Sequence, residues 1–443
     1  MKITPEWRVY ILGVILCVAL TICARNFGDR GGPTFMAALA LAGIAYLLAI
    51  RRFFNTPEFP RRVIVIGLAL TAVWHIDLLR VRSGADDDIH RYVWDGRLQR
   101  LGYNPYLVVP SDHALKGLHT PETRNLNNPD LPSPYPAGAQ LFFRAVTAIQ
   151  ESTFALKVAF VICDFAISLL LLDLLRTTGR AAHLVLAYAW NPLLAIEVAG
   201  SGHIDIVGAL LLVISAAALV RRWRAIAGVG LGLAVAVKFL PIVLLPYYWK
   251  RIRIRDALLA AGVVALLYVP FLNHGPIPIG SLGTYVRTFR FNGPVFAALV
   301  QVAPPQLVVA LAVVVGFVLS IWLRSASPEL SPGSFAWPMA ASLLFAPVVF
   351  PWYLLWLLPF LTSASTMLIS VWSVTIMVTY VQWHLRTLGH PWGALPGWVM
   401  LVEYGWVAIL ATIIGLRGIS RSRATEMLNR VRGVDDSVKE DLL

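Results

Sequence analysis

Three adjacent carboxylates, Asp86, Asp87 and Asp88, follow a long apolar run and open the longest polar segment of the chain. The residues that come next are basic, aromatic or acidic: Arg91, Tyr92, Trp94 and Asp95. A carboxylate within hydrogen-bond reach of a hydroxyl group can take its proton, and a second carboxylate raises the pKa of the first or binds a metal ion or a sugar hydroxyl. A solvated acidic turn is the alternative, but the aromatic neighbours at a membrane boundary favour a site. The pattern leaves open which aspartate is the base.

Two further motifs place polar residues beside or inside apolar runs. His203 and Asp205 stand where one run begins, and they could orient a hydroxyl group or a phosphate. Equally, Asp205 could cap a helix N-terminus. Lys238 lies in the middle of the apolar run 226–249. Because a charge at membrane depth is costly and is by default a functional feature, we predict that Lys238 contacts a phosphate rather than extending to the membrane surface.

Later in the chain, arginines and aromatic residues offer weaker signals. Arg287 and Arg290 lie in a loop expected on the outer side, and Arg matches phosphate oxygens well, although solvated loop charge is the alternative. Trp352, Tyr353 and Trp356 could stack on a sugar or line a lipid groove, but an aromatic belt at the membrane interface is slightly favoured. Three other polar residues in apolar runs are expected to be buried and paired: His75, Asp77 and Glu197.

The composition predicts an all-α, polytopic membrane protein. Hydrophobic residues make up 58% and charged residues 14% of the 443 residues, whereas soluble domains average about 45–50% and about 25%. Repeated apolar runs are long enough to cross a bilayer. The net charge of +13 is explained by Lys and Arg in short cytoplasmic loops, so it indicates no nucleic-acid partner.

The apolar runs predict roughly eleven to thirteen membrane segments within one domain, residues 1–416, followed by a basic cytoplasmic tail, 417–443. The bias of Lys and Arg places both termini in the cytoplasm and the polar loop at about 81–136 outside. Run 226–249 has basic residues at both ends, so we predict a re-entrant or broken pair of half-helices there. Run 335–361, which contains four prolines, is predicted to be broken as well.

Several chemistries have no motif in the chain. It has no Gly-rich phosphate loop, no His-Glu-x-x-His and no spaced pair among Cys17, Cys23 and Cys163. No cofactor is therefore expected to be required, although a divalent metal is compatible with the carboxylates. The longest loop, about 55 residues, lies at the lower edge of domain size and lacks an evident apolar core. A donor substrate is therefore expected to be carried by a lipid.

Two stretches resemble a known family: the sequence from Asp86 to Tyr106, DDDIHRYVWDGRLQRLGYNPY, and the later YPAGAQLFF. They are similar to bacterial polyprenol-phosphate-mannose-dependent mannosyltransferases of the GT-C class. This class includes the alpha-1,6-mannosyltransferase type and glycosyltransferase family 87. Shorter motifs are similar too: Gly202-His203-x-Asp205, Lys238-x-x-Pro241 and Pro351-Trp352-Tyr353. The resemblance implies a helical bundle with an extracytoplasmic active site and inverting sugar transfer. The family's catalytic Asp stands four residues before a Tyr, which implies Asp88, with Asp87 as helper or alternative base.

The expected reaction moves a hexose, which the resemblance implies is mannose, from a polyprenyl-phosphate carrier to a glycan or glycolipid at a bacterial plasma membrane. The residues expected to bind substrate are Asp86, Arg91, Tyr92, Asp95, His203, Asp205, Lys238, Arg287, Arg290, Trp352 and Tyr353. A transporter or flippase for a lipid-linked or sugar substrate is the rival, in which Lys238, Asp205 and Glu197 would line a path; the absence of a clear internal repeat counts against it. A membrane scaffold without activity leaves the aspartates and Lys238 unexplained.

Overall fold

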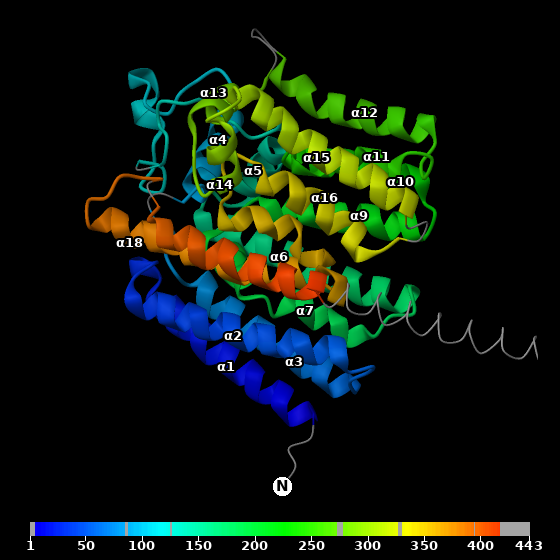
Figure 1. The fold of residues 1–443 in the computed structure, drawn as a ribbon. Helices are drawn as coiled ribbons and strands as arrows, with labels where there is room; N and C mark the ends of the chain where they lie inside the picture. The colour runs from blue at the N-terminus through cyan, green and yellow to red at the C-terminus, as the bar shows by residue number, and fades with distance from the viewer. Residues whose placement is uncertain are drawn as a thin grey trace, which may run out of the picture.

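The chain folds into a bundle of helices that run roughly parallel to one another (Figure 1). The structure is a computed structural model that describes residues 5–84, 87–124, 126–272, 278–326, 330–393 and 395–416. Within these residues it contains helices and one isolated β-bridge, between Phe291 and Val348. A helix satisfies its own backbone hydrogen bonds, which a bilayer core cannot do for it. The all-α membrane fold expected from the composition is therefore confirmed.

Eight helices among the described residues are long and apolar enough to cross a membrane. They are α1 (Pro5–Arg25), α2 (Pro33–Asn55), α3 (Arg61–Leu79), α6 (Thr153–Thr177), α12 (Ile254–Tyr268) with its 3₁₀ extension to Phe271, α15 (Pro305–Ala326), the segment Ala364–Thr387 and the segment Gly397–Leu416. Segment Ala364–Thr387 contains α17 (Met367–Thr375), the 3₁₀ turn η10 (Ile376–Tyr380) and α18 (Val381–Thr387). A bent pair, Ala182–Ala189 with Pro192–Ser201, brings the number to nine if it crosses as one span.

The expected eleven to thirteen segments exceed this number because several apolar runs form helices too short to cross alone. They are α9 (Asp205–Val220), α10 (Arg224–Val237), α11 (Leu245–Tyr248) and α16 (Pro332–Leu344). The outer loop contributes α4 (Ile89–Arg100) and α5 (Ala137–Ile149), and two short helices, α13 (Leu282–Thr288) and α14 (Pro294–Leu299), follow α12. Between α6 and α9 lie α7 (Val185–Ala189), α8 (Pro192–Leu194) and the π-helix η4 (Ala195–Ser201).

The break predicted in run 226–249 is confirmed. Helix α10 ends at Val237, Lys238 has extended backbone, and the chain returns through the 3₁₀ turn η5 (Leu240–Leu244) and α11. The basic residues on both flanks, Arg224 and Lys250, line one pocket. The run therefore enters and leaves at the same end of the molecule, and Lys238 lies at its tip.

The second broken run has the same form. Helix α16 is followed by extended backbone and the 3₁₀ turns η7 (Pro351–Trp356) and η8 (Leu358–Phe360). Pro332 and Phe360, near its two ends, line one narrow crevice. Prolines remove backbone donors and end regular helix, which explains why this run is split into short turns. Its middle, with Trp352 and Tyr353, meets the tip of the first broken run.

Two glycines allow the close approaches at this meeting point. A Cβ atom on Gly208 of α9 would lie 1.9 Å from the ring of Trp356, so only glycine lets η7 pack this tightly against the helix. Gly202 has φ +81°, a conformation that suits glycine, and it turns the chain from the π-helix towards His203. Both glycines therefore allow close packing around the start of α9.

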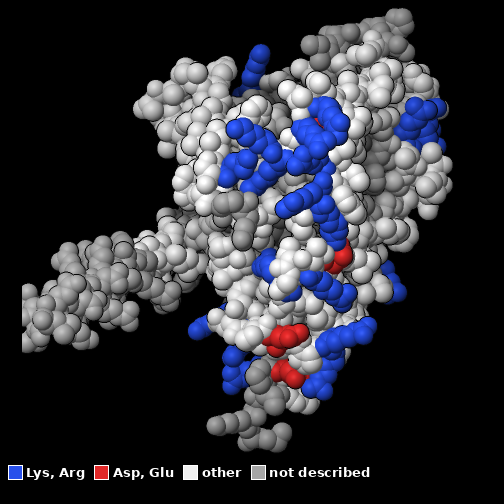
Figure 2. All heavy atoms as spheres, turned by 90° about the vertical axis from the view of Figure 1, so that its right-hand side faces the viewer, with Lys and Arg blue, Asp and Glu red and all other residues white. Residues whose placement is uncertain are grey.

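The two ends of the bundle differ in charge. The outer loop and α18 lie at the left-hand end in Figure 1, and Figure 2 shows the opposite end, where Lys and Arg gather with few acidic residues. The loop is more compact than expected: Trp94, Leu98, Leu115 and Leu126 form a small apolar cluster of their own. The expectation that the loop lacks an apolar core is therefore wrong. The tail from residue 417 lies outside the described residues.

The re-entrant path of run 226–249 predicts the result of cysteine accessibility. In a variant without native cysteines, Arg224→Cys and Arg255→Cys will react with a membrane-impermeant reagent from one side, because both lie at the basic end. Asp112→Cys, in the outer loop, will react from the other side. Labelling of the two arginine positions from opposite sides would show a single crossing instead.

Candidate active site

A cavity of about 710 Å³ lies where the outer loop meets the two broken runs. Its wall combines residues from distant parts of the sequence. Those that matter most for chemistry are Asp87, Asp88, Asn127, Tyr135, His203, Lys238, Tyr285, Trp352 and Tyr353. Pockets that hold small molecules have volumes of about 300–1,000 Å³ with a few convergent polar groups. The size and the lining make this cavity the candidate active site.

Asp88, directly before α4, presents its carboxylate to the cavity. Its Oδ1 accepts a hydrogen bond of 2.7 Å from Asn127 Nδ2, and Tyr135 forms a second side-chain hydrogen bond to it. Burial raises the pKa of Asp88 above the usual value, while the bonds from Asn127 and Tyr135 and the charge of Lys238 act in the opposite direction. A carboxylate with a raised pKa is a better proton acceptor than an ordinary aspartate.

Asp87 is held by protein groups instead. Its Oδ1 lies 2.5 Å from Arg30 Nη2, and its Oδ2 accepts from the backbone N–H of Gly84 at 2.7 Å. Arg30 is buried, donates to Ser201 Oγ at 2.7 Å, and packs over the ring of Trp383. Because both Asp87 oxygens are engaged, the geometry favours Asp88 over Asp87 as the group that meets a substrate.

Lys238 is fixed by a buried ion pair. Its Nζ lies 2.7 Å from Oδ1 of Asp205, which has no solvent exposure, and 3.9 Å from the centre of the Tyr353 ring. The same Asp205 oxygen accepts a bond of 2.8 Å from Trp356 Nε1. Asp205 is the first residue of α9 and makes no capping bond, so the cap alternative is wrong. Its Oδ2 is buried without a hydrogen-bond partner among the described residues.

His203 completes this wall of the cavity. Its Nδ1 lies 3.1 Å from Oε2 of buried Glu197, and its ring stacks on Trp352 with 4.0 Å between the ring centres. Burial and the positive charges of Lys238 and Arg30 lower the pKa of His203 well below its usual value. These effects favour the neutral ring, and if Nδ1–H donates to Glu197, Nε2 is left as an acceptor.

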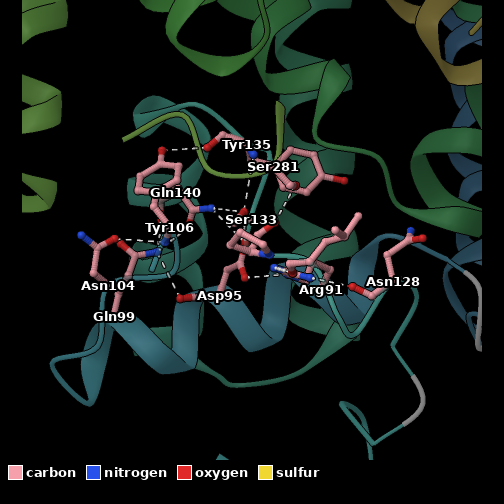
Figure 3. Close-up of polar contacts among 12 residues, drawn as sticks. Arg91, Asp95, Gln99, Asn104, Tyr106, Asn128, Ser133, Tyr135, Gln140 and Ser281 are labelled. Atoms are coloured by element: carbon pink, nitrogen blue, oxygen red, sulfur yellow. Dashed lines mark hydrogen bonds and ion pairs between the residues drawn. The ribbon is translucent and has the colours of Figure 1, made fainter. Parts of the chain in front are cut away.

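A second buried network holds the Pro-rich segment 127–136 over the cavity (Figure 3). Asp95, fully buried, accepts from Arg91 Nε at 2.9 Å and from Ser133 Oγ and Gln140 Nε2. Arg91 in turn donates to the backbone carbonyl groups of residues 128 and 131. Asn127 and Tyr135, which bond Asp88, stand at the two ends of this segment, so the network fixes them in place.

The structure brings some of the predicted site residues together and separates others. Asp87, Asp88, Arg91, His203, Lys238, Trp352 and Tyr353 line the cavity, and Asp205 lies directly behind Lys238. Tyr92 and Asp95 are buried in the protein and do not line it: Tyr92 stacks on Phe143 with 4.4 Å between the ring centres. Asp86 lies outside the described residues.

The two outer arginines and the tryptophans of the expected aromatic belt do not lie where the sequence predicted. Arg287 is exposed, and Arg290 donates to backbone carbonyl groups and packs over Phe296; neither lines the cavity. Trp352 and Trp356 are buried in the interior, so the slightly favoured belt interpretation is wrong for them. The expected burial and pairing of His75 and Glu197 are confirmed by their contacts with Asp164 and His203.

Several residues in or beside the cavity were not predicted as site residues from the sequence. Tyr135 opens the motif YPAGAQLFF, but its contact with Asp88 was not predicted, and Asn127 lies in a polar segment that indicated only a loop. Tyr285, whose hydroxyl lies 2.7 Å from that of Tyr353, lies in α13. Arg30, which pairs with Asp87 behind the cavity wall, lies shortly before α2. The partners of Tyr285 and Arg30 stand 57 or more positions away in the sequence. Only the folded chain therefore reveals these contacts.

Among the described residues, no group of three or more His, Cys, Asp or Glu side chains is arranged to hold a metal ion. The positive charge of Lys238, which lines the same cavity, lowers the pKa of Asp88.

The fold and this cavity define a multi-pass membrane protein in which a candidate catalytic aspartate and a partly buried lysine line one cavity. Residues 19–251, more than half of the chain, match the MptA_B family, described as the N-terminal domain of alpha-(1→6)-mannopyranosyltransferases. The chain belongs to this family and is a mannosyltransferase. No curated protein and no solved structure matched it. The matched range contains Asp88, His203, Asp205 and Lys238 and ends before Trp352.

Proposed function

We propose that the protein transfers mannose from a polyprenyl-phosphate carrier to a hydroxyl group of a glycan or glycolipid at the extracytoplasmic face of the membrane, with Asp88 as the base. The observation that carries the proposal is that Asp88 and Lys238 line the same cavity. Asp88 takes the proton of the acceptor hydroxyl, whose oxygen attacks the anomeric carbon. The bond from that carbon to the phosphate oxygen breaks as the new bond forms.

Lys238 stabilises the negative charge that develops on the leaving phosphate. Groups that are held in place before the reaction stabilise such charge most effectively, and Asp205 and Tyr353 hold Lys238 in this way. His203 and the aromatic ring of Trp352 are available to bind the sugar, since Nε2 accepts a hydrogen bond and the ring offers a flat apolar face. No metal ion is needed in this scheme.

A single displacement inverts the configuration at the anomeric carbon. The arrangement supports this outcome because Asp87, the second carboxylate of the wall, has both oxygens engaged by Arg30 and Gly84. A retaining reaction by double displacement uses a second carboxylate as nucleophile, and Asp87 is poorly placed for that role. The product is therefore expected to have the anomeric configuration opposite to that of the donor.

The lipid carrier and the outer side rest on two features. One part of the cavity wall is apolar and aromatic, with Phe289, Phe350 and Trp392, which suits a hydrocarbon chain better than a nucleotide. Lys and Arg gather at the opposite end of the bundle (Figure 2), and such residues are enriched on the cytoplasmic side. The cavity then opens to the extracytoplasmic side.

Asp88→Asn is predicted to abolish mannose transfer by the purified protein from labelled polyprenyl-phosphate mannose. General base catalysis contributes roughly 10²–10⁴-fold, so the loss should be in this range while the protein stays folded. Asp130→Asn, an exposed change in the same loop, is the control and should keep full activity. Unchanged transfer by Asp88→Asn would move the base to another group. A wild-type protein that transfers from no polyprenyl-phosphate sugar would contradict the proposed donor.

Asn127→Ala is predicted to shift the acidic limb of the pH profile of kcat/KM to higher pH. The hydrogen bond from Asn127 stabilises ionised Asp88 and lowers its pKa, so its removal raises that pKa further. A base works only when deprotonated, and activity will therefore fall at a higher pH than in the wild type. Asn128→Gly, next to it and compatible with φ +48°, should leave the limb in place. A limb that stays or moves to lower pH in Asn127→Ala would contradict Asp88 as the base.

A further inference from the structure

A second pocket, at the basic end of the molecule, has a lining of unusual charge. It measures about 680 Å³ and is formed where the loops after α6, α9 and α11 meet. Its lining residues are Arg180, Arg222, Arg224, Lys250, Arg251, Thr178, Leu219, Val220 and Leu330. Among the described residues, the lining thus has five basic side chains and no acidic one. Figure 2 looks onto this end, where Lys and Arg crowd together.

This basic pocket is separate from the active-site cavity. Helix α9 begins at Asp205 beside the cavity and ends at Val220 in the basic pocket. Its 16 residues span about 24 Å at 1.5 Å per residue. Helix α10 returns from Arg224 to the cavity over 14 residues, or about 21 Å. A ligand in the basic pocket therefore cannot touch the reacting groups.

The backbone and the contacts of the basic residues hold several of them at the pocket. Arg222 and Lys250 have φ +60° and +61°, the left-handed region that residues other than glycine rarely adopt. Arg251 packs its guanidinium over the ring of Tyr247 at 3.9 Å, and Arg180 donates to Thr362 Oγ1 at 3.2 Å. These restraints hold several basic side chains around one pocket, where their charges attract an anion.

The basic pocket continues into an apolar crevice. A narrower cavity of about 60 Å³ between α6, α9 and α16 shares four lining residues with it: Thr178, Arg180, Val220 and Leu330. The rest of this crevice is mainly apolar, with Leu171, Leu174, Phe335 and Phe360. A basic pocket joined to an apolar crevice between membrane helices fits a molecule with an anionic head and a hydrocarbon chain.

We infer that this pocket binds the phosphate headgroup of an anionic glycerophospholipid, with the start of an acyl chain against the crevice. Basic pockets between membrane helices recognise anionic lipid headgroups through the same combination of charge and apolar contact. A free phosphate ion would use the charges but leave the crevice without a role. The site lies away from the groups assigned to sugar transfer. The inference about lipid binding therefore does not depend on the proposed function.

The test is a lipid titration of the delipidated full-length protein followed by native mass spectrometry. The two probes are phosphatidylglycerol and phosphatidylcholine with the same acyl chains. The pocket variant is Arg222→Asn with Lys250→Asn, because Asn tolerates the left-handed backbone. The control is Arg51→Gln with Arg61→Gln, which removes two exposed charges at the same end outside the pocket. Arg224→Gln serves as a milder pocket variant if the double variant does not fold.

The wild type and the control are expected to bind phosphatidylglycerol in preference to phosphatidylcholine. The pocket variant should bind phosphatidylglycerol roughly tenfold to thirtyfold more weakly, since each basic residue beside an anionic lipid contributes on the order of fivefold in affinity. Equal losses in the pocket variant and the control would show unspecific surface charge and overturn the site. Displacement of the lipid by inorganic phosphate at millimolar concentration, or a preference for polyprenyl phosphate, would overturn the assignment to a glycerophospholipid.

Discussion

The buried contact between Asp205 and Lys238 is the interaction on which the active site depends. Asp205 has no solvent exposure, and a carboxylate in that position is tolerated only when it is paired. Its Oδ1 receives Lys238 from one broken run and Trp356 Nε1 from the other. One carboxylate at the start of α9 therefore joins the two broken runs, which would otherwise present unsatisfied backbone and side-chain groups in the middle of a membrane protein.

The arrangement explains why a lysine lies deep in an apolar run. A cation in this position is costly, and its partner Asp205 offsets that cost while leaving the Nζ group partly accessible, at 23% side-chain exposure. The Asp95 network and the Arg30–Asp87 pair then position the outer loop so that Asp88 takes part in the same cavity. Asp205, Asp95 and Asp87 thus have structural tasks, and Asp88 is the carboxylate proposed as the base.

Much of the fold and part of the site could be predicted from the sequence. Hydropathy predicts the membrane helices, and the basic residues on both flanks of run 226–249 predict its return to one end, because Lys and Arg favour a single side. The cluster of carboxylates at residues 86–88 pointed to the loop that lines the cavity. The resemblance implied Asp88, but the residue pattern alone left Asp87 and Asp88 open, because the contact that engages Asp87 comes from Arg30, which lies 57 positions away in the sequence. The burial of Trp356 was missed for the same reason, since its partner Asp205 is 151 positions distant.

The central claim is that the Asp205–Lys238 pair joins the two broken runs, and a double-mutant cycle on the free energy of unfolding in detergent micelles tests it most directly. Breaking a buried pair costs about 3–5 kcal/mol. Lys238→Met should cost more than Asp205→Asn, because it leaves a fully buried carboxylate alone, whereas Lys238 is partly exposed. The double variant should be clearly more stable than the sum of the two losses predicts. Additive losses, as expected for the exposed pair of Glu6 and Arg62, would contradict the account.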